Sequence, residues 1–187
     1  MAEGNGPTQF FSKRKRMSQM ELSVDLMTLL DVQAFLFREA RLLDEGLLEE
    51  WLALFTDDGE YILPIKDGPP PEPAIIRDSR ARLEERVFRL THTLAHSQRP
   101  SSITQHDITN IEVLELEDQN TIVVACNQTV HELRPGNPVQ IGLAQPRSIH
   151  GRCRYRLSNQ SGDWKIREKY CLLLNREFPI YNLTFIF

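Results

Sequence analysis

Residues 149–157 read IHGRCRYRL, and this stretch alternates between two kinds of side chain at every step. The odd positions carry apolar or small residues, while the even positions carry His150 and three arginines. Successive side chains of a β-strand point to opposite faces of a sheet, so the pattern predicts a strand with one face in the core and one basic outer face. Residues 164–174 predict a second strand, in which Trp164, Ile166 and Tyr170 share the inner face.

The link between these two strands decides which side chains face each other. Residues 159–162, NQSG, predict a four-residue hairpin loop. In that register six basic residues would face each other in pairs: Arg156 and Lys165, Arg154 and Arg167, Arg152 and Lys169. Like charges in direct opposition are unfavourable, by up to about 1 kcal/mol for each pair.

Three like-charge pairs in a row favour an acidic partner across this face, because arginine forms bidentate pairs with carboxylates. The alternative is a solvated face whose charges are neutralised by Glu115 or Glu132 on adjacent strands. RNA is a weaker prediction, since no aromatic residues are interleaved on the basic face to stack bases. A contact with another protein subunit is therefore the interpretation we test below.

The preceding sequence extends the sheet. Strand-like alternation recurs in residues 104–116 and 121–133, and the turn sequence EDQN at 117–120 separates the two runs. The proline- and glycine-bearing residues 134–146 predict a longer connection to the strand described first, which is expected over residues 147–157. The C-terminal half is thus expected to be an antiparallel meander.

The N-terminal half follows a different period. Apolar residues at spacings of three and four predict a helix that Ser23 caps, and a second helical stripe covers residues 47–55. Residues 56–59, TDDG, predict a turn before a short strand at 60–65. A charged helix follows, with the single apolar stripe of Leu83, Val87 and Leu90.

Helices followed by a meander predict one α+β domain over residues 23–187, with a curved sheet wrapped around the N-terminal helices. Residues 1–22 have no periodicity and contain the basic cluster KRKR at 13–16, so we expect a tail there. In a chain with net charge −4, that cluster is a weak indication of nucleic-acid binding.

The sequence predicts a cytoplasmic protein. No apolar run approaches the ~20 residues of a membrane-spanning helix, and the N-terminus lacks the layout of a signal peptide. Three cysteines, an odd number and widely spaced, predict buried thiols in a reducing compartment and no disulfide framework.

The sequence offers no pattern that would hold a metal or a cofactor. A Rieske cluster needs Cys-x-His and Cys-x-x-His pairs, and none of the three cysteines has a histidine at either position. His92 and His96 have the spacing that places two imidazoles on one helix face, but no carboxylate lies near them in sequence to complete an iron site. We therefore predict no catalytic, cofactor-binding or metal residues in this chain.

One acid–base alternative remains open. A cone-shaped sheet around helices encloses a pocket, and polar side chains that point into it could catalyse an isomerisation or a dehydration. The candidates are Tyr61, His96, His106 and Asp107, each of which also has an ordinary structural interpretation.

Several stretches resemble the β subunits of Rieske-type aromatic-ring-hydroxylating dioxygenases. FREARLLD at 37–44, EWLALFTDD at 50–58 and YILP at 61–64 are similar to the opening helices and first strand of that family. RVFRL at 86–90, AHSQ at 95–98, and the spaced residues Pro100, Ser102, Thr104, His106 and Asn110 resemble its central block. NLTFIF at 182–187 resembles its apolar C-terminal end, so the match extends over residues 30–187.

The resemblance implies a cystatin-like, NTF2-like fold with a strongly curved, mixed, mainly antiparallel sheet. It implies a non-catalytic β subunit in an α3β3 hexamer with β–β contacts, in which the α subunit holds the Rieske 2Fe-2S cluster and the mononuclear iron. Electrons from NAD(P)H would reach α through a reductase, with or without a ferredoxin, and α would convert an aromatic compound and dioxygen to a cis-dihydrodiol. No nucleic acid and no membrane would be involved.

On this interpretation the partner interface would include the six basic residues paired above, together with Phe185 and Phe187, whose apolar side chains are costly to leave in water. One departure concerns SITQH at 102–106, where the family usually has two arginines. The alternatives are a stand-alone NTF2-like isomerase or dehydratase and a dimeric NTF2-like binding module.

Overall fold

The computed structural model describes residues 26–68, 73–93, 99–137, 139–140, 143–180, 183 and 185–187. Its helices are α1 (Leu26–Asp44), α2 (Leu48–Leu52) and α3 (Arg80–His92). Its strands are β1 (Phe55–Pro64), β2 (Ala74–Ser79), β3 (Ile103–Leu116), β4 (Thr121–Leu133), β5 (Arg147–Gln160) and β6 (Asp163–Leu173). The predicted tail and the Ser23 cap lie outside the described residues.

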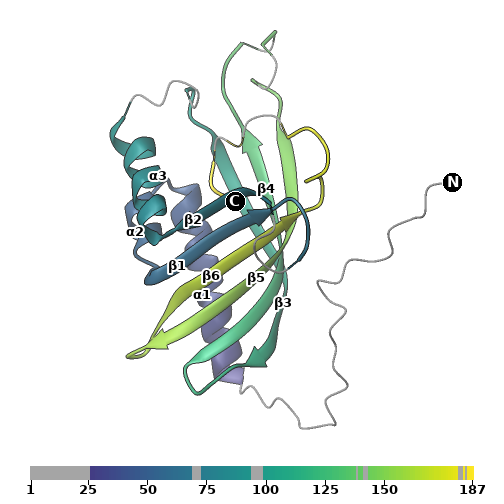
Figure 1. Ribbon diagram of the computed structural model, residues 1–187. Coiled ribbons are helices and arrows are strands. Elements are labelled where there is room, and N and C mark those ends of the chain that lie inside the picture. The colour runs from purple at the N-terminus through teal and green to yellow at the C-terminus, as the bar shows by residue number, and fades with distance from the viewer. Residues whose placement is uncertain are drawn as a thin grey trace, which may run out of the picture.

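One six-stranded sheet with the order β2-β1-β6-β5-β4-β3 forms the body of the protein (Figure 1). All neighbours are antiparallel except β1 and β6, which run parallel. The four C-terminal strands form the meander that the alternation predicts, with bounds close to the expected ones. The α+β prediction and the mixed, mainly antiparallel sheet are confirmed.

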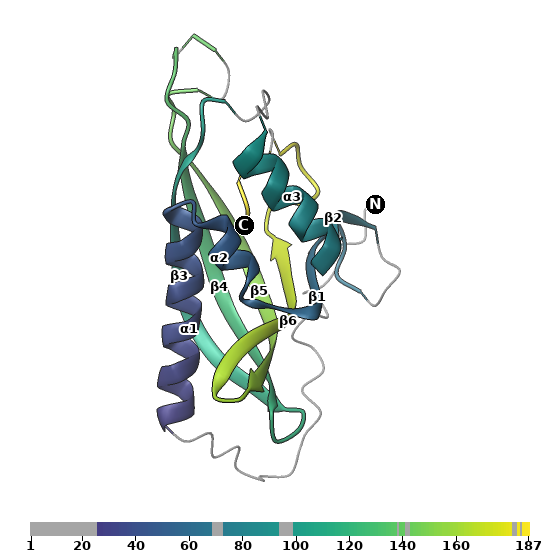
Figure 2. The ribbon, with the colours of Figure 1, turned by 90° about the vertical axis from the view of Figure 1, so that its left-hand side faces the viewer.

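The helices cover one face of this sheet. Figure 2 shows α1 alongside β3, with α2 and α3 on the same side of the curved sheet. Val32, Leu36 and Leu43 on α1 and Leu83 and Val87 on α3 are buried in the main core, as the apolar stripes predict. The inner residues of β5 join the same core, so the sheet wraps around the helices to bury both.

Two features of the N-terminal half differ from the prediction. Residues 56–59 are part of β1, and the pairing with β6 shifts register between Phe55 and Glu60. A Cβ on Gly59 would lie 2.9 Å from the carbonyl oxygen of Thr56, so the TDDG sequence marks a bulge inside a strand. Strand β2 was not predicted, because it lies at the sheet edge and only Asp78 within it is buried.

The hairpin between β5 and β6 also differs from the predicted one. Gln160 pairs with Asp163, so the loop has two residues, Ser161 and Gly162, with φ of 56° and 98°. Positive φ at both positions is the geometry of a type I′ turn, whose twist suits a tight hairpin. A register shift between Arg156 and Leu157 then changes every later pair.

The predicted like-charge pairs are therefore wrong. Arg156 lies opposite Glu168, Arg154 opposite Tyr170, and Arg152 opposite Leu172. Beyond the register shift Lys169 turns inward opposite Tyr155, while Tyr170 moves to the outer face and packs with Ile62 and Leu172. The alternation of β6 is broken at this irregularity, which the period-two pattern could not reveal.

Candidate functional site

The outer sheet face carries its arginines in ion pairs within the chain. Arg154 lies 3.3 Å from Glu168 and 5.3 Å from the ring centroid of Tyr170. Arg156 lies 2.9 Å from Glu117. Two further basic side chains on this face are engaged: Arg167 lies 3.3 Å from Asp58, and Lys165 Nζ donates to the Ala53 carbonyl oxygen at 2.6 Å. The outer face is therefore similar to the solvated face considered above. Its charges are neutralised by Glu168, Glu117 and Asp58 instead of the expected Glu115 or Glu132.

Lys169 is part of the core, which corrects its assignment to the basic face. Its side chain is 0% exposed, and Nζ donates to Glu39 Oε1 at 2.8 Å. The Trp51 indole N–H donates to the same oxygen at 3.1 Å, and the Tyr155 hydroxyl donates to Glu39 Oε2 at 2.8 Å. These hydrogen bonds satisfy the buried carboxylate, which would otherwise be costly.

Burial and the charge of Glu39 have opposite effects on the pKa of Lys169. Burial disfavours the ammonium form of Lys169, but the Glu39 carboxylate, with further contributions from Cys171 and Cys153, raises the pKa of Lys169 above its usual value. Burial also raises the pKa of Tyr155 well above its usual value, and the Glu39 charge adds to the shift. At neutral pH the centre of the core therefore holds a lysine cation and a neutral phenol.

The three cysteines lie side by side across β4, β5 and β6. Cys153 pairs with Cys126 on one side and with Cys171 on the other, and all three are buried free thiols. Burial raises the pKa of the Cys153 thiol well above its usual value. The prediction of small buried residues without a disulfide is confirmed, and these thiols are poor nucleophiles.

The C-terminal residues fold back onto the sheet. The side chain of Phe187 is 1% exposed, and the Tyr61 hydroxyl donates to its carbonyl oxygen at 3.1 Å and accepts from its N–H at 3.0 Å. Burial raises the pKa of Tyr61 well above its usual value. Phe187 therefore belongs to the core rather than to an exposed interface, whereas Phe185 is only partly buried.

A histidine–aspartate pair holds this C-terminal segment to α1. His106 Nδ1 lies 2.5 Å from Asp44 Oδ1, and its Nε2 lies 3.1 Å from the carbonyl oxygen of Ile186. Both ring nitrogens of His106 are therefore engaged within the protein. Burial acts to raise the pKa of Asp44, but the hydrogen bonds from His106 outweigh it and lower the pKa below its usual value.

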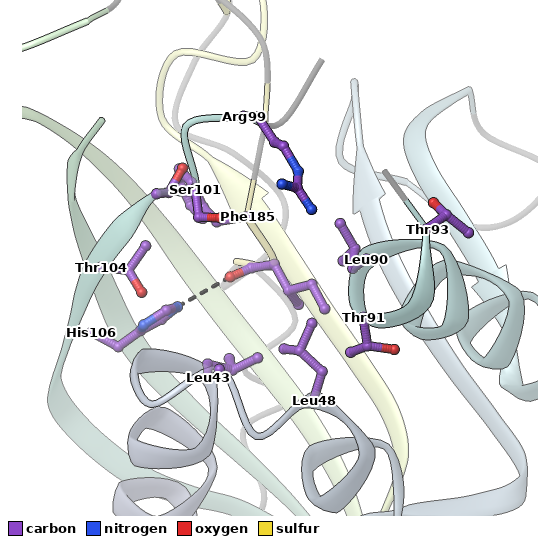
Figure 3. Close-up of a pocket in the computed structure, with 13 residues that line it drawn as sticks. Leu43, Leu48, Leu90, Thr91, Thr93, Arg99, Ser101, Thr104, His106 and Phe185 are labelled. Carbon is purple, nitrogen blue, oxygen red and sulfur yellow. Dashed lines mark hydrogen bonds between the residues drawn. The ribbon is translucent and has the colours of Figure 1, made fainter. Parts of the chain in front are cut away.

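A cavity of about 400 Å³ lies beside His106 (Figure 3). Its described lining comes from the end of α1, from α2 and α3, from the start of β3 and from the C-terminal residues. The lining residues are Leu43, Gly46, Leu48, Leu90, Thr91, Thr93, Arg99, Ser101, Ser102, Thr104, His106, Phe185 and Ile186. The size is within the range of about 300–1,000 Å³ that is usual for small-molecule sites.

Of the acid–base candidates that the structure describes, Tyr61, His106 and Asp107 do not line one cavity. His106 borders the cavity, but both of its ring nitrogens are engaged. Tyr61 binds the backbone of Phe187, and Asp107 lies on the outer face with His131 at 3.0 Å. His96 lies outside the described residues, and within the described ranges no group of three or more potential metal ligands is found.

Sequence reasoning missed Asp44 and Glu39. A signal for Glu39 was available, because it lies three residues after Leu36 and four before Leu43, within the apolar stripe of α1. A carboxylate at such a position needs a buried cation, and Lys169 was expected on the other face. For Asp44 no local signal existed, since its partner His106 is 62 residues away.

Comparisons with known proteins give a consistent result. The family model described as "Ring hydroxylating beta subunit" matches residues 38–179. The small oxygenase component of the p-cumate 2,3-dioxygenase system of Pseudomonas putida is 36% identical over 148 residues, which cover 76% of this chain and 77% of that protein. The β subunit of benzoate 1,2-dioxygenase from Burkholderia mallei superposes with a TM-score of 0.66 at 28% identity, covering 87% of this chain and 97% of that one.

A candidate scytalone dehydratase from Novosphingobium aromaticivorans shares the fold, with a TM-score of 0.58 at 15% identity over 79% of this chain and 85% of that one. The NTF2-like fold is thereby confirmed. No described helix has the length and apolarity needed to cross a bilayer. The matches of the family model and of the P. putida relative show that this chain belongs to the family of ring-hydroxylating dioxygenase β subunits.

Proposed function

We propose that this chain is the non-catalytic β subunit of the terminal oxygenase in a multicomponent aromatic-ring-hydroxylating dioxygenase. The observation that carries this proposal is the family match over residues 38–179, which includes the end of α1, the helices α2 and α3 and all six strands. The engaged nitrogens of His106 and the buried role of Tyr61 support a structural rather than a catalytic subunit.

In this proposal the α partner carries the Rieske 2Fe-2S cluster and the mononuclear iron, and it receives electrons through a reductase, with or without a ferredoxin. The sequence supports this division, because none of its cysteines has the histidine spacing of a Rieske motif. Both dioxygenase relatives described above are named for aromatic carboxylates, p-cumate and benzoate. We therefore propose an aromatic carboxylate as the substrate that α converts to a cis-dihydrodiol.

We further propose an α3β3 assembly in the cytoplasm. Exposed apolar side chains support an interface at the end of the sheet where β4 ends and β5 begins. Ile103 and Leu133 face each other there across β3 and β4, and Leu174 and Phe178 follow β6 at the same end. Ile103 is 60% exposed and Phe178 is 71% exposed. Interface centres are enriched in apolar and aromatic residues and depleted of charge.

The basic outer face, with Arg152, Arg154 and Arg156, is the second candidate contact. A partner on this face has weaker support than the sequence indicated, because Arg154 already pairs with Glu168 and Arg156 with Glu117. An acidic partner would have to displace those carboxylates.

Co-expression with a Rieske-type α subunit tests the proposal. We expect the two chains to co-purify as a red-brown complex, and native mass spectrometry should give three copies of each. The chain expressed alone should be colourless. A strictly monomeric chain that binds no α subunit would overturn the proposal, and a complex of another stoichiometry would overturn the hexamer alone.

A further inference from the structure

We propose that the cavity beside His106 binds a small carboxylate that carries an apolar ring. This site lies in one chain, so the proposal stands apart from the assembly with α and can fail or succeed independently of it. The family match assigns no ligand to the cavity, and Arg99 and Ser101 were not among the predicted site residues.

The cavity has one charged end and an apolar body. Figure 3 shows Arg99 extending into the cavity from its rim, with Leu43 and Leu48 on the opposite side. Leu90 and Phe185 supply further apolar walls. A ligand that fills this space therefore needs an apolar body and a polar group at the Arg99 end.

The charge around the cavity favours an anion. No carboxylate is among the described lining residues. Two carboxylates outside the lining are already bound within the protein. Asp44 forms hydrogen bonds with His106 and Thr104. Glu132 forms hydrogen bonds with Arg147 and Ser102. Arg99 makes no ion pair with any residue that the structure describes, so its guanidinium is available to a ligand.

Most hydroxyl groups in the lining already donate to the protein. Thr91 Oγ1 donates to the Val87 carbonyl oxygen at 2.9 Å, and Thr93 Oγ1 donates to that of Arg89 at 2.6 Å. Thr104 and Ser102 donate to Asp44 and Glu132, as described above. The Arg99 guanidinium, with the Ser101 hydroxyl near it in the chain, is left as the donor set for a ligand. A planar guanidinium matches the two oxygens of a carboxylate.

Titration of the purified full chain with benzoate tests the proposal, by calorimetry and by saturation-transfer NMR. We expect saturable binding of benzoate. Benzamide lacks the charge and acetate lacks the ring, so each should bind at least about tenfold more weakly. The Arg99→Gln variant should lose benzoate binding by a similar factor, and Leu48→Ala should weaken it by less.

Arg82→Gln is the matched control, because Arg82 is an exposed arginine on α3 outside the cavity lining. It should bind benzoate as the parent chain does. Circular dichroism should show that both arginine variants remain folded, as expected for exposed positions. Absence of benzoate binding to the parent chain, equal binding of benzamide, or unchanged binding by Arg99→Gln would each overturn the proposal. The last result would indicate that benzoate binds elsewhere on the chain.

Discussion

At the scale of single residues, the core is organised around the buried ion pair of Glu39 and Lys169. Each charge is at most 1% exposed, so water cannot stabilise either one if its partner is lost. The Trp51 and Tyr155 hydrogen bonds fix the carboxylate, and the Lys169 ammonium lies 5.5 Å from the Tyr155 ring centroid. This network joins α1 and α2 to the two central strands β5 and β6.

The Lys169→Met variant should lose roughly 3–5 kcal/mol of unfolding free energy, because the Glu39 carboxylate stays buried without its cation. Urea denaturation at pH 7 measures the loss. Lys165→Met on the same strand is the control and should cost less than about 1 kcal/mol, since that ammonium is near the surface. The double variant Glu39→Gln with Lys169→Met should regain much of the lost stability. A double variant no more stable than Lys169→Met would contradict the role of the unpaired charge.

The lowered pKa of Asp44 predicts a dependence of stability on pH. Its folded-state pKa lies below the ordinary value of 3.8, so the stabilisation is present above pH 3.8 and is lost as the pH falls through the folded-state pKa. Asp44→Asn should therefore be less stable at pH 7 and should show a shallower loss of stability in acid. Urea midpoints measured between pH 7 and pH 3 check this. Asp107→Asn removes another carboxyl group whose pKa is lowered. Because the Asp107–His131 pair is exposed, this variant should change the pH dependence of stability less than Asp44→Asn does.

At the scale of elements, β5 presents a smooth inner surface to the C-terminal segment. Gly151 lies where the ring of Phe187 packs, and a Cβ at this position would lie 2.8 Å from Phe187 Cε1. The glycine is thus required by close approach rather than by its backbone angles. The sequence showed Gly151 as part of an alternating strand, but only the structure shows what covers it.

Gly151→Ala should cost about 1–3 kcal/mol and should displace the Phe187 ring from the sheet. Thermal unfolding measures the cost, and the NMR signals of the Phe187 ring measure the displacement. Ser158→Ala on the same strand is the control, because Ser158 is only partly buried and an alanine there introduces no clash. An unchanged Phe187 environment in Gly151→Ala would contradict the requirement for a glycine at this position.

The strands of the meander could be predicted because their alternation is local and each strand has one buried face. The register between β5 and β6 could not be predicted from the sequence. The two-residue turn changes the pairing by two residues, and the register shift near Arg156 exchanges the faces of Lys169 and Tyr170. This shift has no signature in the period-two pattern. The same limit applies to the cavity, since Leu43, Arg99 and Phe185 meet only through tertiary packing.

At the scale of the whole molecule, the exposed apolar end of the sheet bears on assembly. Leu174→Ser combined with Phe178→Ser should weaken co-purification with α or the contacts between β subunits, because the exposed side chains are expected at an interface centre. Pull-down and native mass spectrometry check this, with Arg156→Ser on the outer face as the control. Loss of assembly only in the Arg156→Ser variant would place the contact on the basic face instead.

The parallel pairing of β1 with β6 has a consequence for how the chain reaches its native state. Strand β6 lies in the middle of the sheet, yet it is the last of the six along the chain, and Phe55 pairs with Ile166 across more than half of the sequence. Helices α1 to α3 and the β1–β2 hairpin are synthesised long before the strand that joins them to the meander. Such long-range closure slows folding, and until it occurs β1 keeps an open edge that other chains can bind. Co-expression of chaperones should therefore raise the soluble yield of this subunit.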